Sequence, residues 1–237
     1  MYIYNYILFI ILLFVIFIAE LYKNKEPFVY NSTIDFYVIT MKNENRLKNI
    51  ENQIQKQMNI MNTNDNKNNE NNSFDFSIEK VDAVVGKNID IHQLIQQNKI
   101  DPNILNENME YFNKNIDIKK REIGCYLSHL KIYELIKLKN KGEYSVILED
   151  DFEFTKEFMY TLEDTLLNVK KNNIDFDFLF LGILGYNGDN IIDNIFTVPS
   201  NSFQTHGYLV NNKNIDKIIK NLSFIDCIID VQIFRKG

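Results

Sequence analysis

Three consecutive acidic residues, Glu149, Asp150 and Asp151, directly follow the apolar run "YSVIL". Adjacent carboxylates repel one another, and burying them is costly unless a cation offsets their charge. Carboxylate oxygens are hard ligands that suit Mg²⁺ or Mn²⁺, and such an ion leaves coordination positions for phosphate oxygens. It would also stabilise the charge that develops on a departing nucleotide. The acids therefore indicate a metal and phosphate site, although acids that cap the next helix explain them equally well.

A second interpretation of the same letters is a receiver domain, because "SVILEDD" resembles the first strand and acidic pair of response regulators. A receiver domain needs a phosphate-accepting Asp at the end of a later strand. The later strand here ends in "FLFLG", and too little chain follows the acids to complete that fold. The sequence therefore argues against this class.

The elements that must position the acids alternate between strands and helices. Apolar, β-branched and aromatic runs predict strands at Ile34–Met41, Phe76–Gly86, Tyr144–Glu149 and Phe176–Gly182, and a short strand that begins at Gly207. The spacing of apolar residues predicts helices over 44–61, 121–142 and 156–171, and another at the end of 207–222. This alternation favours an α/β fold with a mainly parallel sheet flanked by helices. In such sheets ligands bind at the carboxyl ends of strands, which is where the acids lie.

The N-terminal segment differs from the rest of the chain. Up to Ala19 the only polar side chain is Asn5, and this run of about 18 residues approaches the length of a bilayer-spanning helix. A cleaved signal peptide would need a basic start and a small-residue cleavage site, and neither is present. We therefore expect a transmembrane anchor over residues 1–22, a stalk over 23–33 and one domain over 34–237.

Charge limits both the partners of the chain and its orientation in a membrane. The net charge of −6 argues against a nucleic-acid binder, which is normally basic. Lys23 and Lys25 follow the apolar run, so the positive-inside rule places the domain on the cytoplasmic side. Glu20 and Glu26 offset these lysines and weaken the indication.

Two compositional features predict local behaviour within the domain. The segment around 59–73, which contains "NTNDNKNNENNS", is polar and of low complexity, so we expect a disordered insertion there. The two cysteines, Cys125 and Cys227, are far apart in sequence and form no CxxC motif, which argues against a zinc site or a disulfide scaffold. We expect two free, partly buried thiols, with a single disulfide as the alternative in a luminal domain.

A set of ordered motifs surrounds the acids. The stretches "REIGCYLSHLKIYELI", "VILEDDF" and "FLFLG" together resemble glycosyltransferase family 25, which includes lipopolysaccharide-type and collagen galactosyltransferases. The segments "FYVITMKNENRLKNI", "VDAVVGK", "HGYLVNNKNIDKII" and "FIDCIID" resemble other parts of the same family in the same order. The resemblance implies a GT-A-like, Rossmann-type fold and transfer of a sugar from a nucleotide donor with inversion. It also implies that the acid run corresponds to the metal-binding Asp-x-Asp motif of such enzymes.

The resemblance assigns roles around the metal. Asp151 and Asp150 are expected to ligate Mn²⁺ or Mg²⁺, and His206 to complete the metal shell or touch the diphosphate of the donor. Glu149 occupies the first acid position of the motif and is expected to hold the donor ribose.

Further donor contacts are expected from four residues, namely Thr40, Arg46, Ser128 and His129. Arg46 would pair with a donor phosphate, with a solvated helix arginine as the alternative. Thr40 ends the first strand and would lie under the nucleotide. Ser128 and His129 lie in a helix with two apolar sides, and a structural histidine is as good an explanation of His129 as a donor contact.

Inverting transfer requires a base near the acceptor hydroxyl, usually a carboxylate. Asp226 corresponds best to the late Asp of the family, and Asp230 lies nearby, so the sequence leaves both as candidates. Thr40 and Met41 stand where the family has an Asn-Leu pair, and the chain ends soon after Asp230.

Together these expectations predict a membrane-anchored, metal-dependent glycosyltransferase. It would move a hexose, galactose or glucose, from a UDP-sugar to a glycan, lipid-linked or protein acceptor, and it would have no nucleic-acid partner. The resemblance implies a luminal domain, whereas the flanking charges favour the cytoplasmic side. The alternative function is that of a catalytically inactive relative that acts as a binding or scaffold protein, because the first motif is altered and the C-terminal part is short.

Overall fold

The computed structural model describes residues 33–68, 75–106, 111–182, 188–192, 195–198 and 206–236. The expected anchor over 1–22 and nearly all of the expected stalk lie outside the described residues. Among the helices that are described, none combines the length and the apolar character needed to cross a bilayer.

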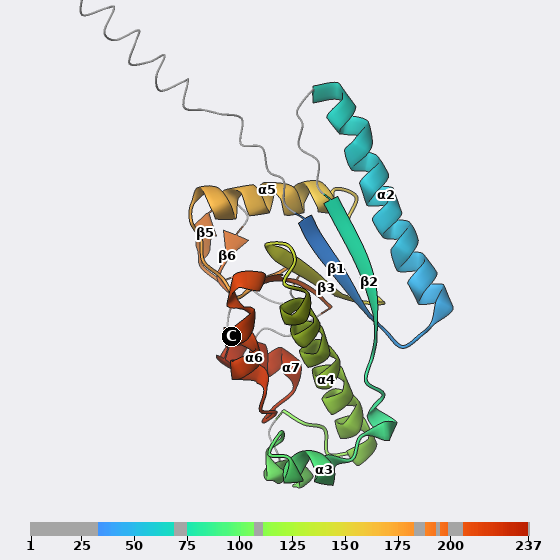
Figure 1. Ribbon diagram of the computed structural model, residues 1–237, viewed down its shortest axis with the longest axis vertical. Helices are drawn as coiled ribbons and strands as arrows, with labels where there is room; N and C mark the ends of the chain where they lie inside the picture. Colours follow the sequence, from blue (N-terminus) through green and yellow to red (C-terminus); the bar gives the residue numbers. More distant parts are fainter. Residues whose placement is uncertain are drawn as a thin grey trace, which may run out of the picture.

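A mixed sheet forms the centre of the domain (Figure 1). Its strands, in spatial order, are β2 (Asp75–Asp82), β1 (Thr33–Thr40), β3 (Tyr144–Glu149), β7 (Gly207–Asn211) and β4 (Phe178–Phe180). β1 runs parallel to β2 and β3, whereas β7 runs antiparallel to both β3 and β4. The expected α/β fold with a mainly parallel sheet is confirmed, and β7 is its one reversed strand.

The central strands bury side chains on both faces. In β1, Phe36 and Val38 belong to one core cluster, while Tyr37 and Ile39 belong to the other. In β3, Val146 belongs to the same cluster as Phe36 and Val38. Strands buried on both faces lack a polar alternation, which is why they appear in the sequence as continuous apolar runs.

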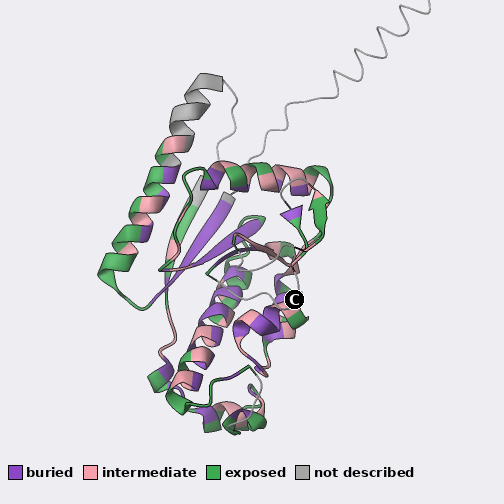
Figure 2. Ribbon diagram, turned by 180° about the vertical axis from the view of Figure 1, so that it is seen from behind, coloured by how far each residue is buried: buried purple, intermediate pink, exposed green. Residues whose placement is uncertain are grey.

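Helices cover both faces of the sheet, and their inner sides carry the buried residues (Figure 2). One core cluster joins the sheet to α2 (Glu44–Asn68) and α5 (Phe158–Lys171). The other joins it to α4 (Ile116–Lys139), α6 (Ile215–Leu222) and α7 (Ile229–Lys236). The remaining described elements are the helix α3 (Ile91–Gln96), the 3₁₀ turns Gly86–Asn88, Pro102–Leu105 and Asn212–Asn214, and a small antiparallel pair, β5 (Asn190–Ile192) and β6 (Ile195–Phe196).

Two helix boundaries differ from the sequence-based expectation. α2 continues to Asn68, into the segment expected to be a disordered insertion, and residues 69–74 lie outside the described part. α4 begins at Ile116, because the side chain of Asn115 accepts hydrogen bonds from the first free N–H groups of the helix. It ends at Lys139, where Asn140 adopts a left-handed conformation that closes the helix.

Candidate functional site

The acids lie at the carboxyl end of β3, where the ends of β1 and β3 meet the start of β7. Ile39 of β1 is in register with Glu149, and Leu148 is in register with Gly207 at the start of β7. The backbone N–H of Glu149 donates to the carbonyl of His206 at 2.9 Å. Because β7 is antiparallel to β3, the residue that precedes β7 is held beside the residue that ends β3.

Three side chains converge at this edge of the sheet: Glu149, Asp151 and His206. His206 Nδ1 lies 3.5 Å from Oε2 of Glu149 and 3.6 Å from Oδ1 of Asp151. One ligand atom from each residue lies within 4.8 Å of the others. Asp151 and His206 are exposed and Glu149 is partly exposed, so a ligand can reach the group from solvent. The expected neighbourhood of Asp151 and His206 is therefore present in the structure.

Asp150 differs from its neighbours, because both of its carboxylate oxygens accept hydrogen bonds from other parts of the protein. Oδ1 accepts a hydrogen bond from Nη1 of Arg46 at 3.1 Å, and Oδ2 accepts one from the backbone N–H of Met41 at 3.3 Å. The residue is only 7% exposed. In this structure the Asp150 carboxylate is bonded within the protein, and its expected role as a metal ligand stays a prediction. Its side chain holds the connection between β1 and α2.

Arg46 lies between two of the acids. Its Nη1 atom is 3.1 Å from Asp150 Oδ1 and 3.6 Å from Asp151 Oδ2, and about half of the side chain remains exposed. Both carboxylates raise the pKa of the guanidinium, the bond to Asp150 most strongly. The arginine thus offsets part of the repulsion between the acids, and it is not the isolated, solvated side chain that the alternative interpretation described.

The connection between β1 and α2 is built to place Arg46. Thr40 is buried, and its hydroxyl accepts a hydrogen bond from the N–H of Lys42, which has a positive φ of 62°. The Asn43 side chain accepts a bond from the N–H of Arg46 and so begins α2. Thr40 therefore stabilises the turn, and its expected place under the nucleotide stays a prediction.

Close packing between α4 and the turn after β2 explains the glycines in the stretches "VDAVVGK" and "REIGCYLSHLKIYELI". A methyl group at Gly124 would lie 2.5 Å from the carbonyl oxygen of Val84, and one at Gly86 would lie 2.6 Å from that of Lys120. The Ser128 hydroxyl donates to the carbonyl of Gly124 and accepts from the N–H of Val84. The buried hydroxyl of Ser128 is therefore bonded to the backbone on both sides, and its expected donor contact stays a prediction.

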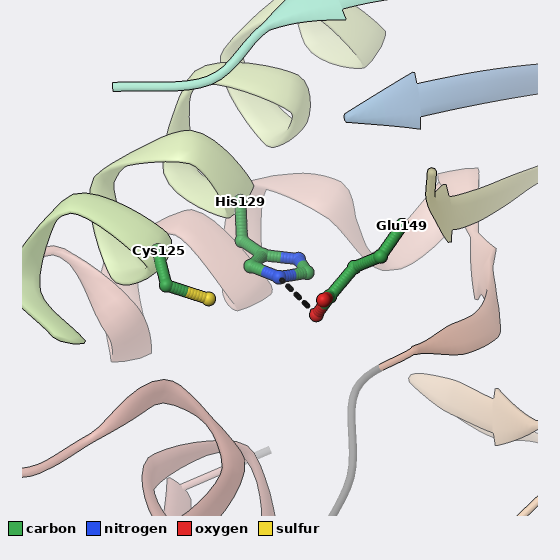
Figure 3. Close-up of side chains that lie close together, drawn as sticks. All are labelled: Cys125, His129 and Glu149. Atoms are coloured by element: carbon green, nitrogen blue, oxygen red, sulfur yellow. Dashed lines mark ion pairs between the residues drawn. The ribbon is translucent and has the colours of Figure 1, made fainter. Parts of the chain in front are cut away.

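His129 is fully buried and faces the acids from α4 (Figure 3). Its Nδ1 atom lies 2.6 Å from the hydroxyl of Tyr208, which in turn lies 2.6 Å from the hydroxyl of Tyr133. Its Nε2 atom points to Glu149 Oε1 at 3.8 Å. His129 is therefore held by tyrosine side chains, and it borders the candidate site through Glu149.

The family model of glycosyltransferase family 25 (LPS biosynthesis protein) matches residues 33–187, which include β1, α4 and the acid run. This chain belongs to glycosyltransferase family 25.

Relatives within family 25 match shorter segments. The chain is 29% identical over 107 residues to procollagen galactosyltransferase 1-B of Xenopus laevis, a segment that covers 43% of this chain and 17% of that protein. It is 24% identical over 109 residues to procollagen galactosyltransferase 1 of Danio rerio, covering 44% and 18%. It is also 32% identical over 65 residues to the probable inactive glycosyltransferase 25 family member 3 of Bos taurus, covering 27% and 11%. The chain thus matches less than a fifth of the length of these family 25 proteins.

The two candidate bases of this family 25 chain have different surroundings. Asp226 forms an ion pair with Lys236 at 2.6 Å between Oδ2 and Nζ. Asp230 lies in the first turn of α7, close enough to Cys125 to help raise the pKa of that thiol. Glu149 acts on the Cys125 thiol in the same direction. The two aspartates differ in their surroundings, and the role of base stays a prediction for both.

Sequence reasoning missed three residues beside the acids: Cys125, Tyr133 and Tyr208. Cys125 and Tyr133 lie four residues before and four residues after His129, a spacing that places all three on one side of a helix. That signal was readable from the sequence. Tyr208 has no such signal, because it reaches His129 only through the pairing of β7 with β3. Both cysteines are free in the structure, as expected.

Proposed function

We propose that this chain is a metal-dependent glycosyltransferase that transfers a hexose, galactose or glucose, from a UDP-sugar with inversion. The observation that carries the proposal is the convergence of Glu149, Asp151 and His206 at the carboxyl end of β3, in a chain of family 25. The acceptor would be a glycan, a lipid-linked sugar or a protein. Relatives named procollagen galactosyltransferase support the galactose donor and a protein acceptor.

The donor atoms fit a hard divalent cation. Two carboxylates and one imidazole nitrogen suit Mn²⁺, and Mg²⁺ less well because of the nitrogen. Glu149, Asp151 and His206 would hold the ion and leave positions for phosphate oxygens of the donor. When bound, the ion would stabilise the negative charge that develops on the UDP leaving group.

Arg46 and the β1–α2 connection would position the donor phosphates. An arginine carries five N–H donors, so Arg46 can hold Asp150 and still donate to a phosphate oxygen. The bonds from Met41 to Asp150 and from Arg46 to Asn43 fix this connection before a donor arrives. Preorganised positive charge of this kind contributes more to a transition state than a mobile side chain does.

Asp230 would accept the proton of the acceptor hydroxyl. Asp230 lies in the first turn of α7 and acts on the Cys125 thiol, whereas Asp226 is held in an ion pair with Lys236. The paired lysine weakens the Asp226 carboxylate as a proton acceptor. We therefore propose Asp230 as the base and assign Asp226 to the attachment of the end of α7.

The proposal extends to the membrane. The apolar run up to Ala19 would anchor the enzyme through a single helix over residues 1–22. Relatives that modify procollagen favour a luminal domain, whereas Lys23 and Lys25 favour the cytoplasmic side.

A test of the function is the release of UDP from UDP-galactose and UDP-glucose by the full-length chain, with Mn²⁺ and with EDTA. We expect Mn²⁺-dependent release, and its loss in Asp151→Asn. Asp164→Asn, an exposed position on α5, is the matched control and should keep full activity. Release in EDTA, or full release by Asp151→Asn, would contradict the metal role.

The second candidate function is an inactive binding protein, which the similarity to relatives named probable inactive family members favours. Calorimetry with UDP and Mn²⁺ separates three outcomes. Binding with UDP release supports the enzyme, binding without release supports the inactive relative, and no binding contradicts both.

A further inference from the structure

A second cluster of potential metal ligands lies behind the acid edge: Cys125, His129 and Glu149. The first two are four residues apart on α4 and therefore share one side of the helix. Glu149 reaches them from the end of β3, and the three side chains point toward one another (Figure 3). One ligand atom from each lies within 4.8 Å of the others.

An unsatisfied nitrogen points into this cluster. His129 is 0% exposed, and its Nε2 atom has no hydrogen-bond partner in the described structure. The distance of 3.8 Å to Glu149 Oε1 is longer than a hydrogen bond. A buried polar atom without a partner costs free energy, so a native structure normally supplies one. A cation between His129, Glu149 and Cys125 would be such a partner.

The surroundings of His129 prepare Nε2 to be a ligand. Nδ1 of His129 lies 2.6 Å from the Tyr208 hydroxyl, which lies 2.6 Å from the Tyr133 hydroxyl. When Tyr208 donates its proton to Tyr133, its oxygen accepts a hydrogen bond from Nδ1–H of His129. The lone pair of the imidazole then lies on Nε2. Metal-bound histidines are commonly oriented in this way by a hydrogen bond to the other ring nitrogen.

The charge in the cluster also favours a cation. The Glu149 carboxylate faces the cluster from the end of β3, with Oε1 3.8 Å from Nε2 of His129, and brings negative charge to it. A divalent cation offsets this negative surplus and replaces the thiol proton, which leaves to solvent.

We propose that Cys125, His129 and Glu149 form a second metal site, specific for a soft divalent cation such as Zn²⁺. Sulfur, nitrogen and oxygen ligands in combination suit Zn²⁺, and three protein ligands leave a fourth position for water. The Glu149–Asp151–His206 group has no sulfur and suits a harder ion. The two sites share Glu149, since Oε1 faces His129 and Oε2 faces His206. The zinc ion would therefore hold Glu149 in position for the donor site.

The test is a titration of the metal-stripped, full-length chain with Co²⁺, which takes zinc sites and absorbs strongly when a thiolate binds it. We expect a thiolate-to-cobalt charge-transfer band that Zn²⁺ removes by competition. Cys125→Ser and Cys125→Ala should both lose the band, with circular dichroism to confirm folding. Cys227→Ala is the matched control at the other free cysteine and should keep it. Tyr208→Phe should weaken Co²⁺ affinity about 10- to 100-fold.

The band separates this site from the donor site. Asp151→Asn should lose Mn²⁺-dependent UDP binding and keep the cobalt band. If the proposed function is wrong, the wild-type chain shows the band without UDP binding. If this inference is wrong, the wild-type chain shows no band, or Cys125→Ser and Cys125→Ala retain it.

Discussion

Asp150 and Arg46 form the contact that organises the acid edge, with 3.1 Å between Oδ1 and Nη1. The aspartate is almost buried and the arginine is half exposed, so one partner belongs to the protein interior and the other can meet a ligand. The positive charge of Arg46 offsets that of the Asp150 carboxylate and so reduces the repulsion within the acid run. Asp151 lies at the surface beside His206.

Removal of Arg46 should weaken donor binding more than it changes the chemistry. In Arg46→Gln we expect the KM for the UDP-sugar to rise about tenfold, because a charged hydrogen bond to phosphate is lost. kcat should change less, and steady-state kinetics at saturating Mn²⁺ measures both. Lys48→Gln, an exposed position in the same helix, is the control and should leave KM unchanged. An unchanged KM in Arg46→Gln would contradict the phosphate role.

Substitutions of Asp226 and Asp230 should have different effects on kcat and on stability. We expect Asp230→Asn to lower kcat by about 10²- to 10⁴-fold with little effect on UDP binding, because a general base acts only in the chemical step. Asp226→Asn should instead lower the thermal midpoint through loss of the pair with Lys236, and it should keep kcat within a few fold. The reverse pattern would show that Asp226 is the base.

Gly124 should tolerate no side chain. A methyl group there would lie 2.5 Å from the carbonyl oxygen of Val84, a backbone atom that cannot rotate away. We expect Gly124→Ala to lower the free energy of unfolding by about 1–3 kcal/mol, as overpacking does elsewhere, despite the better helix propensity of Ala. Urea denaturation measures the change. Glu134→Ala, an exposed position in the same helix, should stay within about 0.5 kcal/mol of the wild type.

The free energy of unfolding should fall as the solution becomes alkaline. Burial raises the pKa of the Cys125 and Cys227 thiols to about 12, and it raises the pKa of the hydroxyls of Tyr126 and Tyr133 above the ordinary range. A thiol in the unfolded chain has a pKa of about 8.5. Above that pH the native state, whose thiols stay protonated, binds more protons than the unfolded chain. The contribution of the thiols is therefore complete below about pH 8.5 and is lost as the pH rises toward 12.

The measurement is the urea midpoint of the metal-free chain in EDTA. We expect a constant midpoint between about pH 7 and 8 and a steady decrease above about pH 8.5. A midpoint that does not change up to about pH 10 would show that these thiols are not held in their protonated form.

Much of the fold follows from local patterns. The apolar run that ends at Glu149 predicted β3 to the residue, because a strand buried on both faces has no polar interruption. The parallel sheet and the place of the acids at its carboxyl edge followed from the alternation of strands and helices. The extent of α2 did not follow, since Asn-rich letters resemble a disordered linker even where the chain continues a helix.

The sequence by itself determined that the chain belongs to an α/β class and that an acid run ends a buried strand. Only the tertiary structure decided which side chains meet. The reversal of β7 brings His206 to Glu149 and Tyr208 to His129. The direction of a strand depends on contacts between residues far apart in the chain. The same contacts decide that Asp150 is buried and that Asp151 faces solvent. No local spacing of residues contains that information.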